Sequence, residues 1–349
     1  MALRDEANNL EQNVKLHSLR RENDRLKEQV KELSSNLDEA INRLSVLEGV
    51  SELDPLPPKW TVPKKIKSSD AIAVAMLSDT HWDIIVRPED VAGVNEYNRT
   101  IATERTKQWA HKLAELPSTG PTADIKGLIL LWAGDMMNGP IDAAHMVGSE
   151  DTTLGTLLYW SEQAAAAITL LADAYGTVHV PVVVGNHGRQ TMKVRTNLKA
   201  RDNLDWVLAH MVRRLTADDK RITWQIDEAP DAEFRVFSNM HVVTHGDQAR
   251  GGGGIGGIWP PLMRLVAKKQ QRQVGLGRPF QTLWMGHWHT ATWGAGDQFV
   301  VNGSLIGPDG YSMGLNLSPD APEQVAALVT GRGVEWRTTI QPQSLGQGK

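Results

Sequence analysis

Three continuous apolar runs lie in the first half of the main part of the chain. They read AIAVAML (71–77), GLILLWA (127–133) and TVHVPVVV (177–184), and polar residues or glycine bound each of them. Apolar runs of this length are typical of strands buried on both faces of a sheet. Two longer segments between the runs, 95–116 and 151–174, predict helices, and the second is rich in alanine. The alternation of strand and helix predicts an α/β fold.

The second half of the chain has a different pattern. A further helix is predicted near 197–216, and four short strand-like pieces follow it among glycine-rich turns. These pieces are FRVF (234–237), MHVVTH (240–245), TLWMGH (282–287) and FVVNGS (299–304). They predict a second, mostly antiparallel sheet that packs beside the first. The C-terminal segment 341–349 is expected to be a disordered tail.

The first fifty residues form a separate unit in the pattern. Apolar residues recur every seven positions from 16 to 47, over more than four heptads, and charged residues lie outside this frame. We therefore expect residues 1–50 to be a coiled coil and the protein to be a homodimer through residues 16–47. Asn23 at a seam position favours a parallel dimer, because a buried Asn pairs best with its own copy. The alternative is an amphipathic helix folded back on its own chain.

The segment that follows the heptads is rich in proline. DPLPPKWTVPKK contains four prolines, and proline opposes regular structure. We therefore expect a semi-rigid Pro/Lys linker at 51–67 and the main domain at 68–340.

Composition limits the location and the partners. The chain has 349 residues, no cysteine and a formal net charge of -4. A fold without cysteine cannot depend on disulfides, which favours a reducing compartment. No apolar run approaches the roughly 20 residues that span a bilayer, so we expect a soluble, cytoplasmic protein without membrane attachment. The net charge excludes a uniformly basic nucleic-acid binder, although it says nothing about local patches.

Aspartate, asparagine or histidine side chains follow five of the predicted strands. Residues i and i+2 of an extended segment face the same side, so Asp79 and His81 can point toward one object, and so can His287 and His289. Each residue alone has an ordinary explanation as a turn residue, a helix cap or a buried histidine. Together they supply a nitrogen and oxygen ligand set large enough for two cations. The set is Asp79, His81, Asp135, Asn186, His187, His245, His287 and His289.

The order of these motifs resembles that of the calcineurin-like metallophosphoesterase superfamily. Asp-x-His, Gly-Asp, Gly-Asn-His, His-Gly and Gly-His-x-His occur in the family's order over residues of roughly 70 to 305. The resemblance implies a four-layer fold of two packed mixed β-sheets flanked by helices. It also implies a two-metal hydrolase of phosphoester bonds, in which paired metals promote displacement at phosphorus.

The resemblance implies a role for each motif residue. Asp135 bridges the two metals, a hydroxide between them is the nucleophile, and His187 stands near the leaving oxygen as a proton donor. Mn²⁺ or Fe²⁺ suits a mixed histidine and carboxylate site, and Zn²⁺ is the alternative. One metal is held by Asp79, His81 and His289, and the other by Asn186, His245 and His287.

One position departs from the family pattern. The family places Asp or Glu directly after the histidine of Gly-Asn-His to orient it, whereas this chain has Gly188. Asp247 and Asp83 are the candidates to orient His187 instead. The Asp-Arg-Gly signature of the protein phosphatases is also missing, because the chain reads GDMMNGP at that place, so that branch is set aside.

Two stretches that adjoin the metal motifs contain basic residues and no acidic ones. Such stretches would attract an extended polyanion, so we expect DNA as substrate and partner. Arg189 and Arg250 are the candidate phosphate-binding residues; the alternative is that the basic side chains only solvate helix faces. The first stretch carries Arg189, Lys193, Arg195, Lys199 and Arg201, and the second carries Arg250, Arg264, Lys268, Lys269, Arg272 and Arg278.

Three functions remain open from the sequence. The first is a two-metal phosphodiesterase or nuclease that acts on DNA, similar to SbcD-type nucleases and to stand-alone phage phosphoesterases. The second keeps the enzyme but replaces DNA by a nucleotide or another small phosphate ester. The third is a non-catalytic coiled-coil scaffold with a structural metal site, which Gly188 favours and the full set of ligands opposes.

Overall fold

A computed structural model of the chain divides into two compact units, residues 1–56 and 57–349. The residues that it describes are 23–25, 27–28, 57–139, 148–191, 193, 197–249, 257–316 and 319–342. Within the first unit only 23–25 and 27–28 are described, and they are helical. The heptad seam and the dimer through residues 16–47 therefore fall almost wholly outside the described residues and stay predictions. So does most of the predicted tail.

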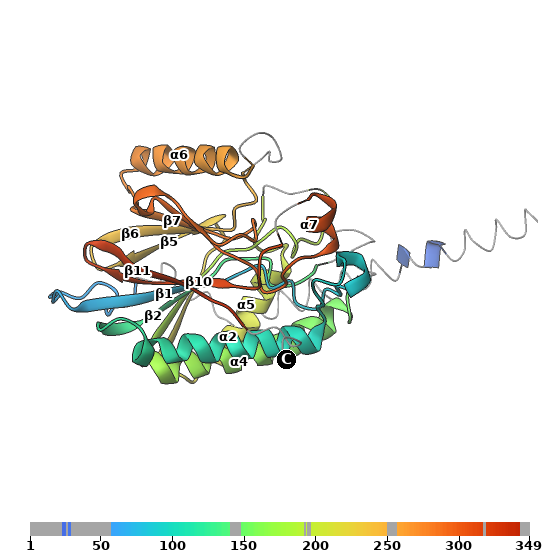
Figure 1. Ribbon diagram of the computed structural model, residues 1–349, viewed down its shortest axis with the longest axis horizontal. Coiled ribbons are helices and arrows are strands. Elements are labelled where there is room, and N and C mark those ends of the chain that lie inside the picture. The colour runs from blue at the N-terminus through green and yellow to red at the C-terminus, as the bar shows by residue number, and fades with distance from the viewer. Residues whose placement is uncertain are drawn as a thin grey trace, which may run out of the picture. The chain divides into compact units, whose positions relative to one another are not determined.

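The first sheet has six strands (Figure 1). Their spatial order is β11 (Gly333–Ile340), β10 (Gln324–Thr330), β1 (Asp70–Leu77), β2 (Asp124–Trp132), β3 (Val178–Val182) and β4 (Ile222–Ile226). The pairs from β1 to β4 are parallel, and β10 runs antiparallel to β1 and β11. All eight residues of β1 are buried, with Ala75 and Leu77 on one face and Val74 and Met76 on the other. Burial on both faces explains the continuous apolar run in the sequence.

The second sheet has five strands, and it is mixed. Their order is β5 (Asp231–Val236), β6 (Asn239–Thr244), β7 (Thr282–Met285), β9 (Phe299–Val301) and β8 (Thr292–Trp293). β6, β7 and β9 pair in parallel, and β5 and β8 are antiparallel edges. The prediction of a mostly antiparallel sheet was wrong, because the long connection through α6 (Trp259–Gly275) returns the chain for parallel pairing. The expected pair of mixed sheets is confirmed.

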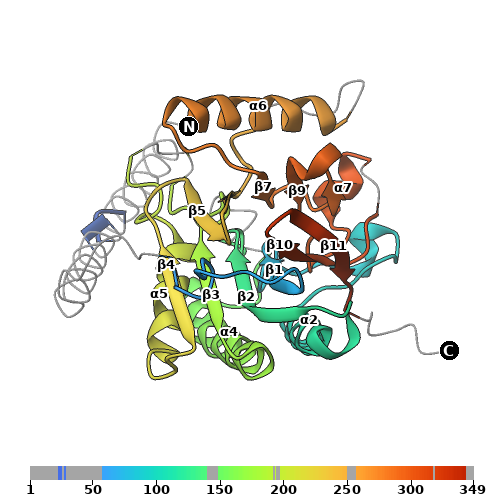
Figure 2. The ribbon, with the colours of Figure 1, turned by 90° about the vertical axis from the view of Figure 1, so that its left-hand side faces the viewer.

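Helices cover the outer faces of both sheets. α2 (Arg99–Thr119), α4 (Thr153–Tyr175) and α5 (Leu204–Leu215) lie below the first sheet in Figure 2, and α6 lies above the second, which gives four layers. The first three begin later than the sequence predicted, each after a capping side chain that accepts a backbone hydrogen bond from the first turn. These caps are Asn98, Thr152 and Asn203. In the described connections there are three short helices, η1 (Pro88–Val91), η2 (Ala295–Asp297) and α7 (Gly310–Gly314).

Tryptophans fill the core beneath the loop that follows β1. Trp82 is fully buried in that loop, and its ring stacks on Trp160 of α4 with 4.4 Å between centroids and an interplanar angle of 3°. Trp132 at the end of β2 meets the Trp82 ring edge-on. Because Asp79 and His81 directly precede Trp82, this packing fixes the loop that presents them.

Residues 57–67 belong to the larger unit and not to a linker. Thr61 is fully buried, and its carbonyl accepts a hydrogen bond of 2.6 Å from the backbone N–H of Phe237. Trp60 packs against the core between the two sheets. The linker prediction was therefore wrong for this part, because Trp60 provides apolar surface to bury among polar and proline neighbours. Positions 51–56 lie outside the described residues.

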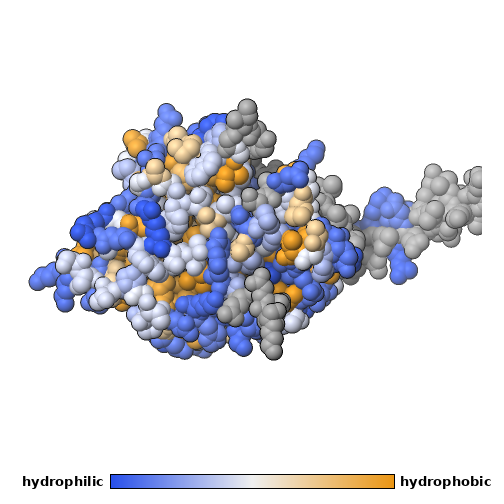
Figure 3. Space-filling model, viewed as in Figure 1, coloured by the Kyte–Doolittle hydropathy of each residue, from blue (hydrophilic) through white to orange (hydrophobic). Residues whose placement is uncertain are grey.

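The face of the domain drawn in Figure 3 is mainly hydrophilic, with small hydrophobic patches between. Exposed large apolar side chains are scattered over different elements, for example Leu158 on α4 and Tyr311 on α7. In the part of the chain that the structure describes, no helix is long and apolar enough to cross a membrane.

Candidate metal centre

The topology brings the polar strand ends together. β1, β2 and β3 are neighbouring parallel strands, and so are β6 and β7, so their carboxyl ends meet where the two sheets face each other. Within the first sheet, the N–H of Asp79 donates to Gly134 O at 3.0 Å and that of His81 to Asp135 O at 3.2 Å. Between the sheets, the N–H of His287 donates to both carboxylate oxygens of Asp79, at 2.9 and 3.0 Å.

Five of the predicted ligands have a left-handed backbone. The φ angle is 52° at Asp79, 43° at His81, 52° at Asp135, 73° at His287 and 55° at His289. Residues other than glycine rarely adopt such values, and strain of this kind concentrates at functional sites. Its recurrence at three separate strand ends indicates that these turns have a role beyond packing.

Asp79, His81 and His289 form the first cluster. The Nε2 atoms of His81 and His289 are 3.1 Å apart, and Nε2 of His289 lies 3.5 Å from Oδ1 of Asp79. The three ligand atoms lie within 4.8 Å of one another. Ser78 donates from Oγ to Oδ2 of Asp79 and so helps to hold this carboxylate. Two imidazole nitrogens at this distance share one proton at most, whereas a cation between them would satisfy both.

Asp135, His245 and His287 form the second cluster, and Asn186 adjoins it. Nε2 of His245 lies 2.9 Å from Oδ2 of Asp135 and 3.1 Å from Oδ1 of Asn186. The ligand atoms of the first three residues lie within 4.8 Å of one another. Nδ1 of His245 donates to Ala133 O at 2.8 Å, which leaves Nε2 as the ligand nitrogen.

The Asp135 carboxylate joins the two clusters. It is buried, with 1% exposed, and it also forms a group with His81 and His187 whose ligand atoms lie within 4.8 Å. Its Oδ1 accepts a hydrogen bond of 2.6 Å from the N–H of His187, while its Oδ2 faces His245. A carboxylate shared in this way has the position of a bridge between two cations.

The electrostatics of the centre favour the forms that bind cations. Burial, together with the rings of His187 and His289, holds the pKa of His81 well below its ordinary value. Burial also lowers the pKa of His287 to about 4. Burial opposes ionisation of Asp135, but His245 and His187 outweigh it and keep the pKa of this carboxyl well below its usual range. Neutral imidazoles and ionised carboxylates are the species that coordinate divalent metals.

His245 and His289 behave differently, because each faces a carboxylate. Burial opposes their protonation, but the charge of Asp135 raises the pKa of His245 to about 10. The hydrogen bond and charge of Asp79 likewise raise the pKa of His289. In both cases a proton lies between a ring nitrogen and a carboxylate oxygen. A metal ion bound to both atoms would take the place of that proton. The donor atoms of both clusters therefore lie where divalent cations can take the place of these protons.

Two glycines leave room for the carboxylates. A Cβ atom at Gly185 would lie 2.1 Å from Oδ1 of Asp135, and one at Gly286 would lie 2.4 Å from Oδ2 of Asp79. Neither glycine has a positive φ, so space rather than conformational freedom requires them. The glycine of each Gly-Asn-His and Gly-His-x-His motif thus has a steric explanation.

His187 lies at the edge of both clusters and is half-buried. Its ring meets that of His81 edge-on, with 4.5 Å between centroids, and its backbone N–H is bonded to Asp135. The two carboxylates predicted to orient it have other partners. Both oxygens of Asp83 bind Arg99, with Thr156 and Trp160 as further donors. The prediction for Asp83 was therefore wrong, whereas Asp247 pairs through Oδ2 with Lys199 at 2.6 Å and its role in orienting His187 stays a prediction.

The Arg189 guanidinium supports the loop that carries Asn186. Its Nε donates to Thr191 O at 3.0 Å and its Nη1 to Asn186 O at 2.7 Å. Two of its donors thus bind carbonyl groups of its own loop, and its role as a phosphate-binding residue stays a prediction. Arg250, the other candidate, lies outside the described residues.

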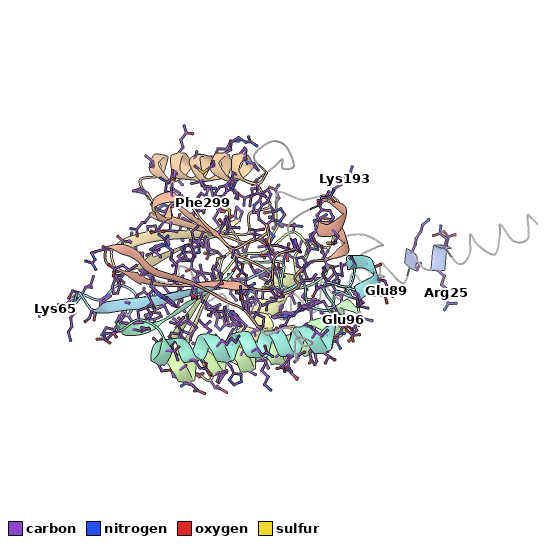
Figure 4. All side chains as sticks on the ribbon, viewed as in Figure 1. Arg25, Lys65, Glu89, Glu96, Lys193 and Phe299 are labelled. Atoms are coloured by element: carbon purple, nitrogen blue, oxygen red, sulfur yellow. The ribbon has the colours of Figure 1, made fainter. Side chains whose placement is uncertain are left out.

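Many basic residues of the two acid-free stretches pair with carboxylates from other segments. Asp231 at the start of β5 binds both Lys269 and Arg272 of α6, and Lys269 is buried. The remaining pairs are Lys199 with Asp247, Arg201 with Glu228, and Arg278 with Glu233. The expected basic face was wrong for these five cations, because the sequence of each stretch does not show the acidic side chains that other segments place beside it. In the described part, Lys193 (labelled in Figure 4), Arg264 and Lys268 make no ion pair.

Two residues at the start of α5 were not predicted to belong to the site. The Asp205 carboxylate accepts hydrogen bonds from the backbone N–H groups of Asp135 and Gly185, both at 2.9 Å. Asn203 donates to Gly185 O at 2.8 Å. Burial, with the nearby charge of Asp135, raises the pKa of Asp205 to about 6. In the sequence, Asn203 and Asp205 at a helix start indicate only a cap and a favourable first-turn charge.

No family model and no curated protein matches the chain. Solved structures similar to it include Vps29 from Cryptosporidium parvum, 12% identical over 75% of this chain and 86% of that one, with a TM-score of 0.32. A hypothetical protein from Pyrococcus horikoshii is 13% identical, with coverages of 79% and 89% and a TM-score of 0.37. An archaeal phosphodiesterase is 9% identical, with coverages of 76% and 99% and a TM-score of 0.32. The interpretation of the centre rests on its own geometry.

Proposed function

We propose that the protein is a two-metal phosphodiesterase of the calcineurin-like type. The observation that carries the proposal is the position of the Asp135 carboxylate, which belongs both to a cluster with His245 and His287 and to one with His81 and His187. Together with Asp79 and His289, these residues offer three or more donors to each of two cations. Mn²⁺ or Fe²⁺ fits this mixture of imidazole and carboxylate, and Zn²⁺ is the alternative.

The residues divide the chemistry between them. When bound, two divalent ions lower the pKa of a water molecule and neutralise charge on the phosphoryl oxygens. Asp135 would hold the ligands of the two clusters at a fixed separation, because its backbone and its carboxylate are hydrogen-bonded to the neighbouring loops. His187 is half-buried beside His81, a place from which its ring can give a proton to the leaving oxygen.

DNA is the substrate that we propose first. The support is the resemblance to SbcD-type nucleases together with described cations of the two basic stretches that make no ion pair, among them Lys193, Arg264 and Lys268. A nucleotide or another small phosphate ester is the second candidate. The observation that favours it is the pairing of Lys199, Lys269 and Arg272 with carboxylates, which removes positive charge that a polyanion would use.

A panel of four substrates separates these candidates. The purified protein is incubated with Mn²⁺ and either linear duplex DNA, single-stranded DNA, bis(p-nitrophenyl) phosphate or p-nitrophenyl phosphate, with Asp135→Asn as the blank. Metal-dependent loss of DNA in the wild type alone supports the nuclease. Turnover of the small esters alone supports the second candidate. If the protein binds Mn²⁺ but turns over none of the four substrates, the result would contradict the proposal of an enzyme and support the non-catalytic scaffold.

A further inference from the structure

The start of α5 is tied to both loops that carry ligands from the ends of β2 and β3. Asp205 is fully buried, and its Oδ2 accepts the N–H groups of Asp135 and Gly185 at 2.9 Å each. Its Oδ1 accepts the N–H of Met136 at 3.1 Å. One carboxylate therefore holds the backbone of the bridging ligand and the residue before Asn186.

Asn203 completes this connection. Its Nδ2 donates to Gly185 O at 2.8 Å, and its Oδ1 accepts the N–H of Asp205 at 2.9 Å. The N–H of Leu204 donates to Gly188 O at 2.7 Å. Asn203 and Asp205 thus satisfy buried backbone groups on the loops after β2 and β3.

Gly188 has a direct explanation in this arrangement. A Cβ atom at this position would lie 2.2 Å from Oδ1 of Asn203 and 3.1 Å from the backbone nitrogen of Asp205. Its φ is not in the left-handed region, so glycine is required by space alone. The position after His187 cannot hold a carboxylate while Asn203 occupies that space.

We infer that Asp205 is a positioning residue of the metal centre, with Asn203 as its support. The inference rests on the proposed metal centre. Asp205 does not touch a reacting atom. It acts through the backbone of Asp135 and Gly185, and so sets the distance between the bridging carboxylate and the Asn186 amide. Groups that orient metal ligands in this way typically affect metal affinity by about 10- to 100-fold.

The matched control is Asp70, another buried carboxylate that accepts a backbone N–H, from Lys67 at 2.9 Å. It lies at the first residue of β1, whereas the metal ligands follow the last residue of that strand. Asp70→Asn and Asp205→Asn both disturb a buried carboxylate, but only Asp205→Asn reaches the centre. Mn²⁺ binding is measured by calorimetric titration, and the melting temperature is measured in EDTA.

We expect Asp205→Asn to weaken Mn²⁺ binding by about 10- to 100-fold and Asp70→Asn to leave it within about two-fold of wild type, whatever their melting temperatures. If both variants bind Mn²⁺ like wild type, Asp205 has a structural role only and the inference is overturned. A wild-type protein that binds no Mn²⁺, Fe²⁺ or Zn²⁺ would instead overturn the proposed metal centre itself.

A second pair of variants serves if Asp205→Asn does not fold. Gly188→Ala should weaken Mn²⁺ binding, because its Cβ displaces the Asn203 amide. In an Asn203→Ala background, where that amide is gone, Gly188→Ala should add less than two-fold. Additive effects of the two substitutions would contradict the steric part of the inference, since independent sites add.

Discussion

Gly286→Ala is expected to weaken metal binding at the cluster that contains Asp79. The new Cβ would lie 2.4 Å from Oδ2 of Asp79 and 2.7 Å from Oγ of Ser78, whereas real Cβ atoms do not approach other heavy atoms within 3.0 Å. The carboxylate must therefore move by roughly 0.6 Å, about three times the deviation of about 0.2 Å that metal coordination tolerates. Among the described residues, Asp79 belongs to the cluster with His81 and His289, and both of its oxygens accept the N–H of His287 from the other cluster.

The assay is the Mn²⁺ content of each variant after equilibrium dialysis. We expect two ions per chain in wild type and fewer than two in Gly286→Ala, because Asp79 is displaced and the N–H of His287 is bonded to it. Overpacking of this kind costs about 1–3 kcal/mol of stability, so folding is checked by thermal melting. Gly331→Ala is the control, because no atom lies within 4 Å of its Cβ position and its φ is not positive. A folded Gly286→Ala protein that retains two ions would refute the assignment of Asp79.

Three further predictions follow from the same geometry. His187→Ala should lower kcat toward a phosphodiester by about 10²- to 10⁴-fold with Mn²⁺ affinity nearly unchanged, and an equal loss of affinity would place His187 among the ligands. Mn²⁺ at 100 times its dissociation constant should stabilise the fold by about 2.7 kcal/mol per site against unfolding, measured by denaturant titration with and without EDTA, and no shift would contradict a native site. Burial lowers the pKa of His241 to about 3 and that of His179 to about 4, so both stay neutral in the fold while the unfolded chain protonates below about pH 6.5. Stability in EDTA should therefore fall by about 1.4 kcal/mol per pH unit for each of them as pH drops from 6.5 toward 4. His241→Gln should flatten this slope, exposed His111→Gln should not, and equal slopes in all three proteins would contradict the cause.

The sequence was sufficient to predict those elements whose burial can be read from their own apolar and polar residues. The buried run of β1 has apolar residues on both faces, and the polar residues directly after it could only lie at the end of the sheet. The strand direction in the second sheet was not readable, because pieces as short as Phe299–Val301 carry no signal for parallel or antiparallel pairing.

Contacts between distant segments account for the other errors. Lys269 is a cation in an acid-free stretch, but Asp231, on a neighbouring strand in space, neutralises it. Asp205 looks like an ordinary acidic residue in the first turn of a helix, yet its oxygens reach the ends of β2 and β3. In the sequence, Gly188 suggested the loss of a functional carboxylate. In the structure, the Asn203 side chain occupies the space that any side chain at this position would need. Each of these depends on packing that no local pattern encodes.

The most direct test of the account is anomalous scattering from crystals soaked in Mn²⁺. Two peaks about 3.5–4 Å apart are expected, with the Asp135 carboxylate between them, one beside Asp79, His81 and His289 and the other beside Asn186, His245 and His287. A single peak, or peaks away from Asp135, would contradict the two-metal centre on which the proposed chemistry depends.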